Sequence, residues 1–230
     1  ILIVARTRAE IREALDDLGE GRRRPPRAFV PTMGALHAGH LSLVGRARKW
    51  ADSQRETDGG DRGRSTDGSG VVILSIFVNP TQFAPEEDFE AYPRALEEDL
   101  DKAREHGVDL VFAPESEKVM HPEGEPRITV DPGSMADRMC GAHRPGHFRG
   151  VLTVVAKLFG LVEPDLAVFG RKDFQQAVLI RRMVLDLELG VEIDVAPLIR
   201  EDDGLALSSR NAYLSPEERE DALGLYEGLK

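Results

Sequence analysis

Two histidines three residues apart, His37 and His40, stand in the segment "VPTMGALHAGH" over residues 30–40. Residues three apart on a helix share a face, so both imidazoles could donate hydrogen bonds to the oxygens of one phosphate. Gly34 permits a turn that a side chain would obstruct, and a helix N-terminus after that turn offers unpaired N–H groups to an anion. The segment predicts a phosphate site. Half of a metal site and an ordinary surface pair remain open alternatives.

A second segment, "FGRKDFQQ" over residues 169–176, has a similar character. Lys172 is a mobile point charge suited to phosphate, and Asp173 can cap the helix expected to follow. Gln175 or Gln176 would then point from the first turn toward a ligand. The alternative is a basic surface loop followed by an ordinary helix cap.

Two further segments carry polar groups without a decisive pattern. In "LALSSRNAYL", Ser208, Ser209 and Arg210 offer two hydroxyls and a fork of N–H donors that could close over phosphates, although the same residues also make a polar loop. In "FVNPTQF", Asn79 and Gln82 supply uncharged donors and acceptors for hydroxyl and carboxylate groups. An Asn-Pro pair is also common turn chemistry.

A basic stretch runs from Arg138 to Val162 without any Asp or Glu. In a chain with a formal net charge of −11, such a stretch is a local attractor for a polyanion, or else a dimer contact.

The elements that must position these residues alternate along the chain. Apolar runs that read as strands are followed by segments with helical periodicity, and capping residues such as Thr7 and Ser215 mark helix starts. This alternation predicts an α/β fold with a doubly wound, Rossmann-like parallel sheet, in which ligands collect beyond the carboxyl ends of the strands. We expect one nucleotide-binding domain over residues 1–197 and the beginning of a second over 198–230. Strands are expected within 27–31, 71–78, 108–114, 165–170 and 191–200, and helices within 7–21, 38–50, 94–107, 146–164, 173–189 and 215–230.

Composition excludes several classes of protein. The 230 residues include one cysteine, Cys140, so an intrachain disulfide and a multi-thiolate metal site are excluded and a reducing, cytoplasmic location is expected. No charge-free apolar run approaches the ~18 residues of a membrane span, and the negative charge opposes nucleic-acid binding. There is no P-loop, no Gly-x-Gly-x-x-Gly and no Gly-x-Ser-x-Gly. Kinases, dinucleotide dehydrogenases and α/β-hydrolases are therefore disfavoured. Residues 51–70, rich in Gly, Ser, Asp and Arg, predict a flexible surface loop.

Six segments follow one another in a fixed order over residues 30–214: "PTMGALHAGH", "SIFVNPTQF", "YPR", "RPGHFRGVLTVV", "FGRKDFQQ" and "REDDGLALSSRN". Together they resemble one enzyme family, the pantoate-beta-alanine ligases, also called pantothenate synthetases. The histidine segment alone would indicate only the wider nucleotidylyl transferase superfamily. The loop from Gln54 to Gly70 looks like an insertion relative to the family.

The resemblance implies an ATP-dependent ligase that uses Mg²⁺. ATP and pantoate would give pantoyl adenylate and pyrophosphate, and the amine of beta-alanine would then displace AMP. A homodimer and a small carboxyl-terminal domain over the active site are also implied. The implied catalytic residues are His40, as the proton donor, His37 and Lys172. The implied ATP-binding residues are Met33, His37, His40, Gly170, Lys172, Asp173, Ser208, Ser209 and Arg210. Pantoate would contact Gln82, Gln176 and Asn79, and magnesium would contact Asp99.

Two rival functions remain. Another adenylyl or cytidylyl transferase on the same fold would release pyrophosphate with its own acceptor. A nucleotide-binding module without catalysis would bind ATP and release nothing.

Overall fold

The computed structural model describes residues 1–19, 24–54, 70–84 and 87–228. One parallel sheet of six strands, in the order β1-β4-β3-β2-β5-β6, forms the middle layer. The predicted α/β class and parallel sheet are confirmed. The strands are β1 (Ile3–Ala5), β2 (Arg27–Thr32), β3 (Val71–Ile76), β4 (Leu110–Phe112), β5 (Leu166–Gly170) and β6 (Glu192–Ala196).

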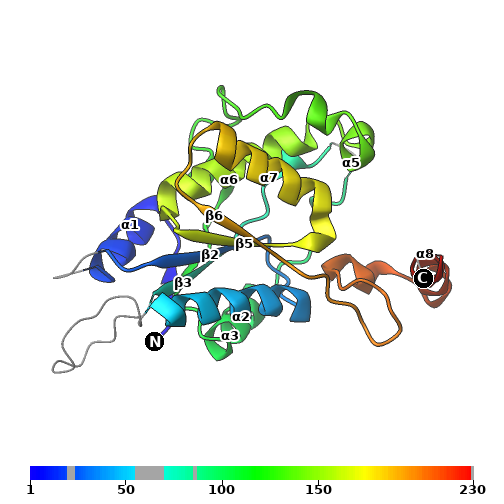
Figure 1. The fold of residues 1–230 in the computed structure, drawn as a ribbon, viewed down its shortest axis with the longest axis horizontal. Helices are drawn as coiled ribbons and strands as arrows, with labels where there is room; N and C mark the ends of the chain where they lie inside the picture. The colour runs from blue at the N-terminus through cyan, green and yellow to red at the C-terminus, as the bar shows by residue number, and fades with distance from the viewer. Residues whose placement is uncertain (20–23, 55–69, 85–86, 229–230) are drawn as a thin grey trace.

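Helices cover both faces of the sheet, as Figure 1 shows. Helices α1 (Arg8–Asp17), α6 (His147–Val162) and α7 (Phe174–Asp186) pack on one face, and α2 (Ala38–Ser53) and α3 (Leu96–Glu105) on the other. Successive residues of β2 serve the two cores in turn, because side chains of a strand alternate between faces. The remaining helices are α4 (Glu117–Met120), α5 (Met139–His143) and α8 (Pro216–Glu227), with 3-10 turns η2 (Pro80–Gln82), η3 (Gly133–Ala136), η4 (Arg171–Asp173) and η5 (Ser209–Tyr213).

Two of the three predicted helix caps form as expected, whereas Asp173 lies at the N-cap position of α7 without a capping hydrogen bond from its side chain. The Thr7 side chain accepts a hydrogen bond from the amide of Glu10 at the start of α1. Ser215 and Glu218 form a reciprocal capping box at the start of α8. Side-chain acceptors at these positions satisfy amides that have no partner inside the helix.

The direction of winding changes at β2. This strand pairs with β3 on one side and with β5 on the other, so the chain leaves β2 toward one edge of the sheet and later returns to fill the other. Ligands of doubly wound folds bind in the crevice at such a switch point. The carboxyl ends of β2 and β5 carry the two predicted phosphate segments.

The ladder between β2 and β5 is short. Strands β2 and β3 are in register from Arg27 to Thr32, whereas β2 pairs with β5 only through Ala28 and Phe29. Pro31 has no N–H to donate, so the end of β2 is poorly suited to continuing that ladder. A gap between the two strand ends results.

Residues after β6 form an arm beside the sheet. A bridge joins Arg200 to Ala206, and α8 has no buried residue. Figure 1 shows α8 lying away from the sheet and its covering helices. The division of the chain at residue 197 remains a prediction.

The elements differ from expectation in several places. The last predicted strand is shorter than 191–200 and ends at Ala196. Strand β1 and the short helices α4 and α5 were not predicted. Of the predicted loop over 51–70, residues 51–54 end α2 and residue 70 precedes β3, while 55–69 lie outside the described residues. Within the described part of the chain, no helix is long and apolar enough to cross a membrane.

Candidate active site

The turn after β2 is hydrogen-bonded to helix α3. Gly34 adopts φ +84°, and a Cβ there would lie 2.9 Å from Asp99 Oδ2 and 3.0 Å from Ile76 Cγ2. The Asp99 carboxylate accepts from the amides of Ala35 at 2.8 Å and Leu36 at 2.7 Å. Glycine therefore suits this turn both for its conformation and for the close approach of the carboxylate.

Asp99 fits poorly as a metal ligand. Its side chain is almost fully buried, and each of its oxygens accepts a hydrogen bond from a different amide. Burial, the largest influence, raises the pKa of Asp99, whereas the two amides lower it. Among the described residues, no group of three His, Cys, Asp or Glu could hold a metal ion. The geometry gives Asp99 a role in shaping the turn, and magnesium binding there remains a prediction without support from the geometry.

The two histidines form a capping box at the start of α2. The ring Nδ1 of His37 accepts from the amide of Gly39 at 3.1 Å, and Nδ1 of His40 accepts from the amide of His37 at 3.4 Å. His37 is thus the N-cap rather than a residue of the helix, which differs from the predicted shared helical face. The two rings nevertheless lie together, with centroids 4.1 Å apart.

This capping decides where the imidazole protons lie. Since each Nδ1 acts as an acceptor, the proton of each neutral ring is on Nε2, which is left to donate to a ligand. Burial, together with His37 and Lys172, lowers the pKa of His40 to about 3. Burial and the nearby lysines also lower the pKa of His37. In the ligand-free protein His40 is therefore neutral near pH 7 and donates a hydrogen bond rather than an excess proton.

Lys172 and the histidines face one cavity of about 120 Å³. Lys172 and Asp173 reach it from η4, directly after β5, and the Lys172 ammonium lies 3.4 Å from an Asp173 oxygen. Part of the wall comes from the segment after β6. The cavity is lined by Pro31, His37, Gly39, His40, Leu43, Phe169, Gly170, Lys172, Asp173, Gln176, Pro197, Leu198, Ile199 and Leu207.

A second cavity of about 140 Å³ adjoins the first. It has an apolar wall from α6, including Val151, Val154 and Leu158, and polar groups from Gln82 and Gln176. Such a mixture suits a small branched molecule with a few polar groups. The two cavities share five lining residues, which are Pro31, His40, Phe169, Asp173 and Gln176. Pro31 and Phe169 come from the ends of β2 and β5, so both cavities open where the ladder between these strands stops.

Gln82 and Met33 meet in the second cavity, where Gln82 Nε2 lies 3.1 Å from Met33 Sδ. Asn79 does not line either of these cavities; it is 1% exposed and contacts the Gln82 side chain from behind. Of the two glutamines in the second phosphate segment, Gln176 faces the cavities, whereas Gln175 donates to backbone carbonyls of residues 135 and 138.

The predicted Ser-Ser-Arg cover lies at the rim, not in either cavity. The Arg210 guanidinium makes two hydrogen bonds of 2.8 Å to the Asp88 carboxylate. The Ser209 and Tyr92 hydroxyls are 3.2 Å apart, and Ser208 caps η5. This segment is therefore tied to the 88–92 segment, and Leu207 just before it is the residue that reaches the first cavity.

The basic stretch is partly neutralised within the structure. Arg144 pairs with Glu87 at 2.7 Å, and Arg149 pairs with Asp131 at 2.9 Å. The Lys157 ammonium donates to a neutral group, the carbonyl of Met120. Ion pairs at two of the four Lys and Arg residues weaken the attraction for a polyanion, which remains a prediction for the stretch as a whole.

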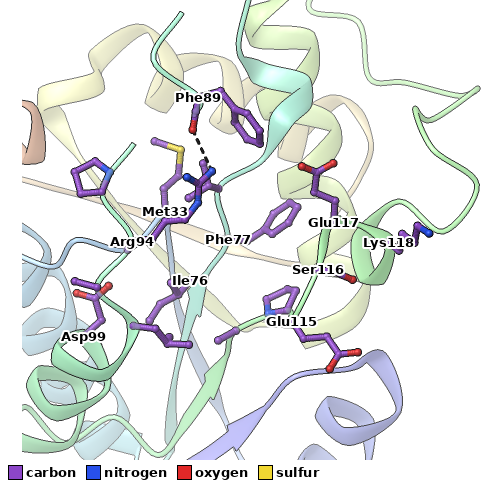
Figure 2. Close-up of a pocket in the computed structure, with 17 residues that line it drawn as sticks. Met33, Ile76, Phe77, Phe89, Arg94, Asp99, Glu115, Ser116, Glu117 and Lys118 are labelled. Carbon is purple, nitrogen blue, oxygen red and sulfur yellow. Dashed lines mark hydrogen bonds between the residues drawn. The ribbon is translucent and has the colours of Figure 1, made fainter. Parts of the chain in front are cut away.

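A third cavity, larger than these two at about 720 Å³, lies at the carboxyl ends of β3 and β4 (Figure 2). It shares Met33 and Phe77 with the 140 Å³ cavity. Its central cation is already engaged, because Arg94 donates to the carbonyls of Phe89 at 3.0 Å and Glu90 at 3.2 Å, as the dashed line in Figure 2 shows for Phe89. Size alone would favour this cavity, but convergent free donors favour the two smaller ones.

Comparison with known proteins gives close relatives over the whole chain. A pantothenate synthetase of Nocardioides sp. is 54% identical over 228 residues, which cover 99% of this chain and 64% of that protein. The chain thus spans slightly less than two thirds of that relative. The solved pantothenate synthetase of Thermus thermophilus is 48% identical, with a TM-score of 0.82 over 98% of this chain and 72% of the other.

A second solved relative, from Francisella tularensis, is described as pantoate-beta-alanine ligase complexed with beta-gamma ATP and beta-alanine. It is 36% identical, with a TM-score of 0.83, over 99% of this chain and 78% of the other. A family model described as pantoate-beta-alanine ligase matches residues 3–55 and 62–230, leaving 56–61 unmatched inside the segment that the sequence marks as an insertion. The chain therefore belongs to the pantoate-beta-alanine ligase family.

Proposed function

We propose that this chain forms the ATP- and pantoate-binding part of an ATP-dependent ligase that joins pantoate to beta-alanine through pantoyl adenylate. One observation carries the proposal. The first cavity, which His37 and Lys172 line, adjoins the second cavity, which Gln82 lines, and His40 and Gln176 line both. A phosphate in the first and a carboxylate in the second would be neighbours. Family membership supports the choice of substrates.

The first cavity suits the phosphates of ATP. His37 and His40 line it with Nδ1 engaged, so their Nε2–H groups would donate to a phosphate there, and the Lys172 ammonium adds positive charge. Attack of a carboxylate oxygen on the α-phosphorus forms a P–O bond while the bond to pyrophosphate breaks, so negative charge grows on the phosphate oxygens. Fixed donors and an ammonium stabilise that charge without a protein nucleophile. Mg²⁺ bound to the ATP phosphates would supply further charge neutralisation.

The second cavity suits pantoate, which has a carboxylate, two hydroxyls and a dimethyl-substituted carbon. The methyl groups would lie on the apolar wall of α6, and Gln82 and Gln176 would bind the oxygens without opposing the charge of the carboxylate. The amine of beta-alanine would then attack the acyl carbon, AMP would leave with the bonding electron pair, and the amine would lose a proton to solvent. A closed site would protect the mixed anhydride from water.

The further expectations belong to the same proposal. We propose a cytoplasmic homodimer that binds neither nucleic acid nor membrane, with Ser208, Ser209 and Arg210 moving onto the phosphates when ATP binds. The domain boundary near residue 197 is also part of it.

The deciding experiment is incubation with ATP, Mg²⁺ and pantoate, with and without beta-alanine, with products identified by mass. Pyrophosphate release that requires pantoate supports the ligase. Release with another acceptor only would indicate a different nucleotidylyl transferase, and ATP binding without any release would indicate a binding module.

Lys172→Ala should lower pyrophosphate release by ~10²-fold or more, because a transition-state donor is lost. Arg171→Ala is the matched control, since it removes the same charge from the same turn at a residue outside both cavities. Equal rates for the two variants would refute the role of Lys172.

A further inference from the structure

A buried chain of polar side chains runs behind the second cavity and ends at Gln82. The Lys157 Nζ lies 3.2 Å from His121 Nδ1, and His121 Nε2 lies 3.0 Å from Asn79 Oδ1. Asn79 Nδ2 then donates to Gln82 Oε1 at 3.3 Å. His121 is 6% exposed and Asn79 is 1% exposed, so water does not compete strongly for these groups.

The hydrogen bonds along this row of side chains have a fixed donor-to-acceptor direction, because the Lys157 ammonium at one end can only donate. An ammonium has no acceptor, so Lys157 makes His121 Nδ1 the acceptor and leaves the ring proton on Nε2. Nε2–H therefore donates to Asn79 Oδ1. Burial, Lys157 and Arg8 lower the pKa of His121 to about 4, so the ring stays neutral and Nδ1 remains free to accept.

Asn79 transmits this donor-to-acceptor direction to Gln82. Asn79 Oδ1 also accepts from the Thr81 hydroxyl at 3.1 Å, and Asn79 Nδ2 lies 3.4 Å from the carbonyl of Gly150, which can only accept. With Gln82 Oε1 engaged by Asn79, the Gln82 amide has its NH₂ group directed into the cavity. There it contacts Met33 Sδ, a weak acceptor that a substrate oxygen would readily replace.

We propose that Lys157 and His121 are positioning residues that fix the orientation of the Gln82 amide, so that the substrate cavity presents an NH₂ donor and selects an accepting oxygen. This rests on the proposed function, in which Gln82 binds pantoate. It also gives Asn79, which was expected to touch pantoate, an indirect role. If these hydrogen bonds ran in the opposite direction, the Gln82 amide would turn its Oε1 toward the substrate carboxylate and repel it.

The test is the dissociation constant of pantoate, measured by calorimetry, with that of ATP measured alongside. His121→Phe removes the Nε2–H donor at similar size and should weaken pantoate binding about tenfold, the effect of roughly one hydrogen bond. Lys157→Met should act in the same direction. His121→Gln places an amide NH₂ near the position of Nε2–H and should recover most of the loss. ATP binding should change less than twofold in all three.

Two variants serve as matched controls. His106→Phe and Lys49→Met make the same chemical changes at exposed positions that take no part in this row of hydrogen bonds. Both variants should leave the two dissociation constants unchanged. A double-mutant cycle then shows whether the effect passes through Gln82. In a Gln82→Met background the His121→Phe penalty should disappear, because no amide is left to orient.

The outcomes separate the two proposals. A wild-type protein that does not bind pantoate refutes the proposed function itself. Wild-type binding with no loss in His121→Phe and Lys157→Met overturns the positioning role. So does an equal loss of ATP binding, a penalty that persists without Gln82, or failure of His121→Gln to recover binding.

Discussion

Replacement of Asp99 by asparagine should destabilise the protein without any involvement of metal. The carboxylate accepts from the amides of Ala35 and Leu36 at 2.8 and 2.7 Å, and the side chain is 1% exposed. Asparagine keeps one acceptor oxygen but turns an NH₂ group toward the other amide. One buried N–H then lacks a partner and the remaining hydrogen bond loses its charge.

The size of the effect follows from these two changes. An unsatisfied buried donor costs about 1–3 kcal/mol, and exchange of a charged for a neutral acceptor costs about 1 kcal/mol more. A loss of about 2–4 kcal/mol is expected from a total of about 5–15 kcal/mol, so the variant still folds. With a slope of about 2–3 kcal/mol per molar urea, the midpoint should fall by roughly 1 M.

Urea unfolding in EDTA at pH 7 is the assay. Asp101→Asn is the control, because Asp101 lies on the same helix, is largely exposed and pairs with Arg104 at the surface. It should cost less than about 0.5 kcal/mol. If Asp99→Asn is as stable as wild type in EDTA, and only Mg²⁺ separates the two proteins, then Asp99 is a metal ligand and the structural reasoning is wrong.

Three further outcomes are expected. Gly34→Ala should cost about 1–3 kcal/mol in urea unfolding, because it places a side chain at φ +84° against a carboxylate oxygen; unchanged stability would contradict this. The lowered pKa of His40, about 3 against 6.5, means that the native state binds fewer protons than the unfolded state between these values. The stabilising contribution of His40 is therefore present above pH 6.5 and is lost as the pH falls toward 3. Over that range the free energy of unfolding should change by roughly 1.4 kcal/mol per pH unit, and His40→Gln should remove this dependence. Finally, Asp88→Asn should strengthen ATP binding and Arg210→Gln weaken it, each by about threefold (~0.7 kcal/mol) in calorimetry, if the guanidinium moves from Asp88 to a phosphate; changes of the same sign would refute that movement.

Features encoded locally could be predicted from the sequence. The continuous apolar run at 71–78 predicts a strand covered on both faces, and β3 is buried in that way. The alternation of strands and helices gives the parallel sheet, and the sheet brings the segments of His40 and Lys172 together at the switch point. Their shared cavity is consistent with that expectation, while what they bind remains a proposal.

Features that depend on contacts distant in sequence could not be predicted. Asp99 is one of several acids in its helix, and nothing in the sequence distinguishes the one that meets the turn 63 residues earlier. His121 and Asn79 are 42 residues apart, and neither stands in a pattern that reveals the other. Strand β1 has only three residues, too few for periodicity, and forms because β4 offers it an edge.

Because the β2–β5 ladder ends early, the existence of the hollow and the shape of its wall depend on different parts of the protein. Both cavities open beyond the last β2–β5 pair, that of Phe29 with Ala167, and the ends of the two strands line them through Pro31 and Phe169. Replacing wall residues such as Val151 or Leu207 would therefore alter which molecules fit while leaving a hollow between the strand ends. Under the proposed function, substrate preference could be changed at the partly exposed Leu207, whereas replacement of Val151, which belongs to the buried core, would also cost stability.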